Sequence, residues 1–172
     1  MHASDDHLTT GFVGTPMLLP ALSAIGETDL AYTLLTNKTY PSWGYEIENG
    51  ATTVWERWNS IKPDGSFGDV SMNSFNHYAY GAVGDWMHQN IGGISPIEAG
   101  YKSTKIAPVT GGGITHADAS FDSAYGTIST DWTTENGGLE LTADVPVNTT
   151  AEVVLPAENA YAISESGTLA AN

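Results

Sequence analysis

Two short segments carry the residues of this chain that are best suited to chemistry. The first is Thr-Thr-Val-Trp-Glu-Arg-Trp at 52–58, where Glu56 lies between two tryptophans and beside the only arginine, Arg57. The second is Asn-Ser-Phe-Asn-His-Tyr-Ala-Tyr-Gly at 73–81, where His77 lies among aromatic residues. A carboxylate can activate water, an imidazole can bind a hydroxyl, and aromatic rings can stack on a sugar. These are the groups that an enzyme needs to hold a sugar ring and activate water.

Glu56 also has a purely structural interpretation. Thr53 and Glu56 match a capping box, in which the glutamate only satisfies a backbone N–H at the start of a helix. The pattern alone favours this cap. In the functional interpretation Glu56 is a general base, and Trp55 and Trp58 share a helix face and exclude water. Arg57 then keeps the carboxylate ionised or binds a hydroxyl.

His77 and its aromatic neighbours can likewise be explained by packing. A histidine on a helix is more often a buried, hydrogen-bonded residue than a catalytic one. The aromatic residues between 40 and 80 can form a core, although their density exceeds what packing needs; they are Trp43, Tyr45, Trp55, Trp58, Tyr78 and Tyr80. The residue pattern leaves both interpretations open.

Two helices are predicted before these segments. Thr15 can cap the first helix with Pro16 at its first position, and Gly26 follows its end. Pro20 is expected to kink or restart that helix. Thr28 can cap a second helix, and the short connection predicts an antiparallel pair.

The elements that hold the two chemical segments are predicted to be helical as well. Residues 40–45 form an aromatic loop, residues 52–58 a short helix, and residues 74–90 a long helix. Apolar residues recur along this long helix at helical spacing: Phe75, Ala79, Val83, Trp86 and Met87. Glu56 and His77 are both expected to lie on helices.

The hydrophobic period changes from 3.6 to 2 at about residue 104. Apolar and polar residues alternate over 128–134 and over 139–145, and the Glu-Asn-Gly-Gly sequence at 135–138 predicts a hairpin between them. Residues 151–155 form a further strand. Short strands at this spacing predict an antiparallel β-sandwich, with a domain boundary near residue 103.

Composition excludes several classes of protein. Five basic and twenty acidic residues give a net charge of −15, which disfavours nucleic acid and anionic membranes as partners. Cysteine is absent, which excludes disulfides, thiolate catalysis and cysteine-ligated zinc. The sequence shows no export signal or membrane span, and the compartment is not determined.

Metal sites have little support in the sequence. Asp5, Asp6 and His7 could bind a metal, but an exposed polar terminus explains them better. His116 and Asp118 share a strand face without a third ligand. We expect neither a metal nor a cofactor.

Several segments resemble, in the same order along the chain, the bacterial α-L-rhamnosidases, which are inverting glycoside hydrolases. They are His-Leu-Thr-Thr-Gly-Phe-x-Gly-Thr-Pro at 7–16, Tyr-Pro-Ser-Trp at 40–43, Gly-Ala-Thr-Thr-Val-Trp-Glu-Arg-Trp at 50–58, the 73–81 segment, and shorter stretches at 100–102, 120–126 and 146–151. The resemblance implies an α+β fold. Residues 1–102 would be the terminal helices of an (α/α)6 catalytic barrel, and residues 103–172 a C-terminal antiparallel β-sandwich.

The resemblance also implies roles for individual residues. Glu56 corresponds to the family's general base and His77 to a residue that contacts rhamnose, with Trp55, Arg57 and Trp58 as further substrate-binding residues. An inverting hydrolase needs a second carboxylic acid. In the family this acid belongs to an Arg-Asp-Glu-Arg-type segment, which this chain lacks.

The missing acid segment predicts a C-terminal fragment of an α-L-rhamnosidase that is inactive alone. Its expected partners are a rhamnose-containing glycoside and an N-terminal catalytic portion. One alternative is a non-catalytic module that binds carbohydrate or complements a separate chain. Another is a truncated product without function, which would be poorly soluble because its barrel helices expose an apolar patch.

Overall fold

The computed structural model describes residues 5–169 of the chain. By contacts these residues divide into two compact units, 5–87 with 110–114 and 88–109 with 115–169. The domain boundary near residue 103 stays a prediction, because these units are defined by contacts and not by independent folding. No helix in the described part is long and apolar enough to cross a membrane.

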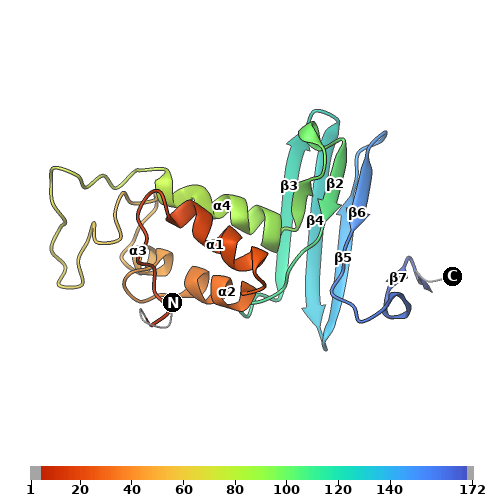
Figure 1. Ribbon diagram of the computed structural model, residues 1–172, viewed down its shortest axis with the longest axis horizontal. Helices are drawn as coiled ribbons and strands as arrows, with labels where there is room; N and C mark the ends of the chain where they lie inside the picture. Colours follow the sequence, from red (N-terminus) through yellow and green to blue (C-terminus); the bar gives the residue numbers. More distant parts are fainter. Residues whose placement is uncertain (1–4, 170–172) are drawn as a thin grey trace. The chain divides into compact units, whose positions relative to one another are not determined.

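The first unit is built from short helices (Figure 1). They are α1 (Thr15–Ala24), α2 (Thr28–Thr36), α3 (Trp43–Glu48), the 3₁₀ turn η2 (Ala79–Ala82) and α4 (Val83–Trp86). The π-helical turn η3 (Met87–Ile91) follows α4 directly, and its residues from His88 onward belong to the second unit. Helix α1 packs against α2, η2 and α4, and α2 packs against α3. The predicted pair of N-terminal helices is confirmed.

Details of these two helices differ from the prediction. Helix α1 continues through Pro20 without a break, and Gly26, with a φ of 83°, follows its C-cap at Ile25. Thr15 is not the cap, because Gly14 occupies that position and the Thr15 hydroxyl donates to Gly11 O within the first turn. Thr28 also lies inside its helix and provides no side-chain cap.

Helix predictions for the two chemical segments are wrong. Residues 52–58 form no helix, and the predicted helix at 74–90 begins only at Ala79. The backbone N–H groups of Glu56 and His77 pair between the two segments instead of within a helix. The aromatic loop at 40–45 is also shorter than predicted, because α3 begins at Trp43 after its N-cap Ser42.

The core of the first unit is aromatic. Its buried hydrophobic side chains are Leu8, Leu19, Leu22, Ala31, Tyr32, Leu34, Trp43, Trp55, Trp58, Tyr80 and Trp86. Tyr32 packs edge-on against Trp86, with 5.3 Å between ring centroids. The segment 110–114 returns to this core at Gly111, where a Cβ atom would lie 2.5 Å from the Tyr32 ring. Only glycine permits so close an approach.

The second unit consists of two three-stranded sheets and a short ribbon. The first sheet has the strand order β1 (Ile94–Pro96), β2 (Ser103–Ile106), β6 (Thr150–Val153). The second sheet has the order β3 (His116–Ser123), β4 (Gly126–Glu135), β5 (Gly138–Asp144). The short two-stranded ribbon near the C-terminus pairs β7 (Ser164–Glu165) with β8 (Thr168–Leu169). The turn η4 (Ala99–Tyr101) joins β1 to β2, and η5 (Ala160–Ala162) precedes β7. All pairs are antiparallel, as predicted, except β2 with β6, which is parallel.

The hairpin predicted at 135–138 is confirmed. Glu135 pairs with Gly138, and Asn136 and Gly137 adopt φ values of 51° and 79°, as the tight turn between twisted strands requires. The predicted alternation on β4 is also confirmed, because its core side chains are buried: Ile128, Thr130 and Trp132. Period and turn chemistry are local signals, so the sequence shows them directly.

Candidate active site

The two chemical segments meet in an irregular ribbon, which we call the site ribbon and define as residues 53–56 and 74–77. The N–H of Glu56 donates to Ser74 O at 2.9 Å, and the N–H of His77 donates to Val54 O at 2.8 Å. These two backbone bonds place the residues of the predicted carboxylate and the predicted imidazole on neighbouring segments of the chain. The sequence predicted both residues, and the structure brings them together without the helices expected to carry them.

The Glu56 side chain is part-exposed and bonded on one side. Its Oε2 accepts the N–H of Ser74 at 2.6 Å, while its Oε1 makes no hydrogen bond within the described residues. The capping-box interpretation is therefore wrong, because the N–H that Glu56 satisfies is not at the start of a helix but belongs to Ser74, 18 residues further on. The Thr53 hydroxyl donates to Phe75 O and caps nothing. The carboxylate is held in place with one oxygen available.

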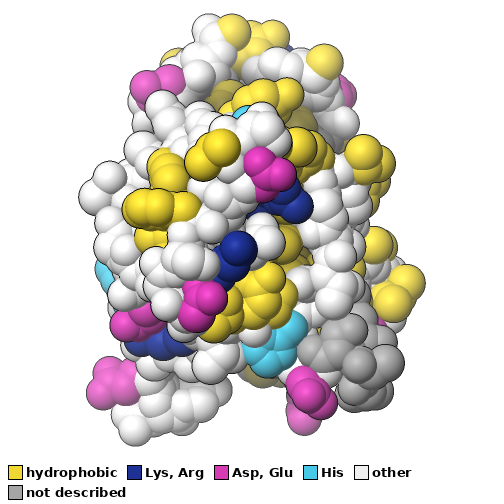
Figure 2. All heavy atoms as spheres, turned by 90° about the vertical axis from the view of Figure 1, so that its left-hand side faces the viewer, with side chains coloured by type: hydrophobic (Ala, Val, Ile, Leu, Met, Phe, Trp, Pro, Cys, Tyr) yellow, Lys and Arg dark blue, Asp and Glu magenta, His cyan; other side chains and the backbone are white. Residues whose placement is uncertain are grey.

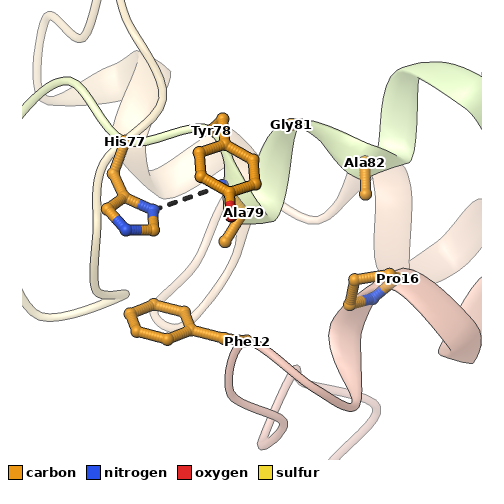
Figure 3. Close-up of a pocket in the computed structure, with 7 residues that line it drawn as sticks. All are labelled: Phe12, Pro16, His77, Tyr78, Ala79, Gly81 and Ala82. Atoms are coloured by element: carbon orange, nitrogen blue, oxygen red, sulfur yellow. Dashed lines mark hydrogen bonds between the residues drawn. The ribbon is translucent and has the colours of Figure 1, made fainter.

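The His77 imidazole lies between two aromatic rings. Its ring is nearly parallel to that of Phe12, with centroids 5.0 Å apart, and to that of Tyr78, at 5.3 Å. Its Nδ1 accepts the N–H of Ala79 at 3.2 Å (Figure 3). Because Nδ1 is an acceptor in this bond, the ring proton of the neutral imidazole is on Nε2. His77 thus offers an oriented N–H donor.

A hollow of about 510 Å³ lies beside His77. Figure 3 shows the residues that line it: Phe12, Pro16, His77, Tyr78, Ala79, Gly81 and Ala82. Phe12 and Pro16 come from the segment at the start of α1, and the other five from the chain around η2. His77 is the one ionisable group among them apart from the phenol of Tyr78, and Glu56 does not line this hollow.

The two predicted tryptophans are core residues. Trp58 stacks on Tyr80 at a centroid distance of 3.8 Å and donates from Nε1 to Thr10 O at 2.8 Å. Trp55 is 2 % exposed and packs edge-on against Phe75. Because no helix forms here, their spacing of three does not put them on a shared face. Their substrate-binding role stays a prediction, and the observed contacts are with the chain itself.

Arg57 is part-exposed and forms no ion pair with Glu56 among the described residues. Its charge acts elsewhere. The pKa of the Asp69 carboxyl is lowered, first because the N–H and hydroxyl of Ser71 donate to it, and to a smaller extent by the charges of Arg57 and Lys62. The role of Arg57 in substrate binding stays a prediction.

Sequence reasoning missed a buried carboxyl beside the ribbon, that of Glu46. Its side chain is 3 % exposed, and its Oε2 accepts the N–H of Trp55 at 3.4 Å. Burial raises the pKa of Glu46 to about 7, and the bond from Trp55 opposes this only in part. Its Oε1 is buried without a partner in the described part of the chain. The available signal was its place three residues after the buried Trp43 on α3.

The raised pKa of Glu46 predicts a pH-dependent stability. The folded state holds this proton more tightly than the unfolded chain, so the contribution is complete below the ordinary value of 4.5 and is lost as pH rises to about 7. We expect the free energy of unfolding to fall by about 1–3 kcal/mol over this interval. Urea unfolding at pH 4.5 and pH 7.5 measures it. Glu46→Gln should flatten the dependence, and the exposed control Glu48→Gln should retain it; equal slopes in both variants would contradict the assignment.

Hydrophobic side chains are exposed on the loop that joins the two segments of the ribbon. Three are large: Phe67, Val70 and Met72. The face in Figure 2 carries several groups of hydrophobic side chains among a few charged ones.

The residues considered as possible metal ligands have other partners in the structure. Within residues 5–169 no three His, Asp or Glu side chains come close enough to share an ion. His116 pairs with Asp131 at 3.3 Å on the neighbouring strand, and His7 bonds Asp5 O and the Thr39 hydroxyl, each at 2.7 Å.

Two family models match almost the whole chain. Residues 1–91 match the bacterial α-L-rhamnosidase six-hairpin glycosidase domain, and residues 93–170 match the bacterial α-L-rhamnosidase C-terminal domain. The chain belongs to the bacterial α-L-rhamnosidase family. These matches confirm the predicted resemblance and the α+β architecture, in which the terminal helices of the glycosidase domain are followed by a β-sandwich.

Curated relatives carry the same family name over a much greater length. The chain is 57 % identical over 159 residues to an α-L-rhamnosidase of Streptomyces avermitilis, covering 92 % of this chain and 15 % of the relative. It is 49 % identical over 160 residues to one of Formosa agariphila, covering 93 % of this chain and 17 % of the relative. The chain therefore spans about one sixth of the length of these α-L-rhamnosidases and corresponds to their C-terminal part.

Solved structures of α-L-rhamnosidases share the fold. The Streptomyces avermitilis enzyme complexed with L-rhamnose matches with a TM-score of 0.91 at 52 % identity, over 96 % of this chain and 17 % of that one. The native Aspergillus terreus enzyme matches with a TM-score of 0.87 at 44 % identity, over 91 % of this chain and 18 % of that one.

Proposed function

We propose that this chain carries the general-base side of a site that hydrolyses terminal α-L-rhamnosides with inversion. Glu56 is the base, and His77 donates from Nε2 to a hydroxyl of the sugar. The observation that carries this proposal is the site ribbon, because its two backbone bonds hold Glu56 and His77 on neighbouring segments. The relatives named α-L-rhamnosidases support the class of substrate.

The geometry of Glu56 suits the removal of a proton from water. Its Oε2 is bound to the Ser74 N–H, so the carboxylate is oriented, and its Oε1 can accept a proton from the attacking water. In an inverting reaction the water oxygen bonds to the anomeric carbon while the glycosidic C–O bond breaks. A second carboxylic acid gives its proton to the leaving oxygen. Trp55 and Trp58 position the ribbon, and Arg57 is available to a hydroxyl of the substrate.

Glu46, whose carboxyl bonds the backbone of the site ribbon, is not the acid of this reaction. Its side chain is 3 % exposed and bonds the backbone of Trp55. A carboxyl buried in this way does not contact the leaving group of a substrate bound at the surface. We propose that the acid comes from the part of an α-L-rhamnosidase that this chain does not span. Without general acid catalysis the rate falls by roughly 10²–10⁴-fold, before any loss of binding surface.

A chimeric enzyme tests this proposal. In the Streptomyces avermitilis relative, the region matched by this chain is replaced by residues 5–169, and hydrolysis of an aryl α-L-rhamnoside is measured. We expect turnover by the chimera and none above background by the 172-residue chain alone. Robust turnover by the isolated chain that Glu56→Gln abolishes would contradict the missing-acid proposal. A folded but inactive chimera would contradict the assignment of the site.

A further inference from the structure

One peptide group connects the two residues of the proposed site to a third. In the peptide group between Val54 and Trp55, the Val54 carbonyl accepts the N–H of His77 at 2.8 Å. The Trp55 N–H of the same peptide group donates to Glu46 Oε2 at 3.4 Å. Glu56 is the next residue along the chain. A shift of this peptide would therefore move both the base and the backbone of His77.

The site ribbon depends on such contacts because it lies outside any helix or regular strand. Residues 74–77 hold segment 53–56 on one side through backbone bonds and the Thr53 hydroxyl. Glu46 contacts the same segment from α3. The end of α3 is also bonded to the residues that lead to the site ribbon, because the Glu46 carbonyl accepts the N–H groups of Asn49 and Ala51 at 3.1 Å and 3.0 Å.

Stability alone does not account for a carboxyl at this position. Burying an acid is costly, and Glu46 Oε1 has no partner in the described residues to offset that cost. An apolar side chain of similar volume would avoid the cost of burying a carboxyl, but it would leave the Trp55 N–H without this acceptor. The raised pKa of Glu46 expresses the same penalty. The contact that an apolar residue could not make is the bond to the Trp55 N–H.

We propose that Glu46 is a positioning residue of the rhamnoside site, acting through the Val54–Trp55 peptide to keep Glu56 and His77 in register. This inference rests on the proposed function. The charged and ionisable groups that act on the same region are Tyr80, whose pKa is raised first by burial and then by the charge of Glu46, and Arg57, which partly offsets this. Neither one replaces the bond to the peptide.

Amide hydrogen exchange of the 172-residue chain tests the positioning role. Glu46→Leu removes the acceptor, and Glu46→Gln keeps an acceptor oxygen of the same shape; Glu48→Gln on the exposed side of α3 is the matched control. For Glu46→Leu we expect the amides of His77 and Glu56 to exchange about tenfold faster. The amide of Ala31 in α2 should be unchanged, because a local shift does not unfold the unit. Glu46→Gln should lie between Glu46→Leu and wild type.

The outcomes separate this inference from the proposed function. Equal acceleration at all three amides would show a general loss of stability and overturn the positioning role, as would unchanged exchange at His77 and Glu56. If Glu46→Leu does not fold, the same comparison is made with Glu46→Gln. In the chimera, Glu46→Gln should lower kcat and leave KM within about twofold, since the base is displaced more than sugar binding. An inactive wild-type chimera would contradict the proposed function and leave the exchange result standing.

Discussion

Glu56→Gln in the chimeric α-L-rhamnosidase is expected to lower kcat by roughly 10²–10⁴-fold. Glutamine keeps the shape of the side chain, and its carbonyl oxygen can still accept the N–H of Ser74, as Glu56 Oε2 does at 2.6 Å. The ribbon should therefore keep its structure. The amide cannot take a proton from water, so the loss falls on the chemical step, and KM should change little. Steady-state kinetics with an aryl α-L-rhamnoside measure both quantities.

Two controls make the result specific to a base. Glu48→Gln removes an exposed carboxylate of α3 that pairs with Lys38, and we expect no change in kcat. Glu56→Ala opens space where the proposed base lay, so added azide, which needs no base, should restore part of the turnover and yield the inverted glycosyl azide. A Glu56→Gln chimera with near wild-type kcat would exclude Glu56 as the general base.

Trp58→Ala is expected to lower the free energy of unfolding by about 3–5 kcal/mol. The indole is buried, stacks on Tyr80 at 3.8 Å and packs edge-on against Trp43 at 5.3 Å. Its Nε1–H also donates to Thr10 O, so truncation leaves both a cavity and a lost hydrogen bond. Urea unfolding of the 172-residue chain, followed by circular dichroism, measures the change.

Trp58→Phe separates packing from sugar binding. Phenylalanine keeps a ring against Tyr80 but loses the Nε1–H, so we expect a smaller loss of about 1–3 kcal/mol. If Trp58→Ala changed stability by less than about 0.5 kcal/mol and instead abolished rhamnoside affinity in the chimera, the indole would be a substrate contact. The buried contacts favour the first result.

The β-strands and their hairpin could be predicted from the sequence because their signals are local. Asn136 and Gly137 tolerate the positive φ values of the turn, and alternation along β4 identifies Ile128 and Trp132 as buried. The parallel pairing of β2 with β6 was not predicted. Those strands are more than forty residues apart, and no local pattern encodes which distant strand a given strand pairs with.

The helices predicted for the chemical segments failed for a related reason. Glu56 accepts a backbone N–H, as in a capping box, but that of Ser74, and the Thr53 hydroxyl donates to Phe75 O instead of accepting an N–H. Helix propensity along the chain does not include hydrogen-bond partners that lie about twenty residues away. Because the segments pair and form no helix, Trp55 and Trp58 do not share a helix face, and each is buried against different aromatic rings.

The sequence by itself identified the family and predicted which residues carry the chemistry, because residue types and their order are the same in the chain whatever its conformation. Glu56 and His77 could be named in this way. Only the tertiary structure decided that their backbones are paired, that the two tryptophans are buried, and that Glu46 lies behind the ribbon. These features arise from contacts between segments distant in sequence, and their energies depend on burial, which a linear pattern does not contain.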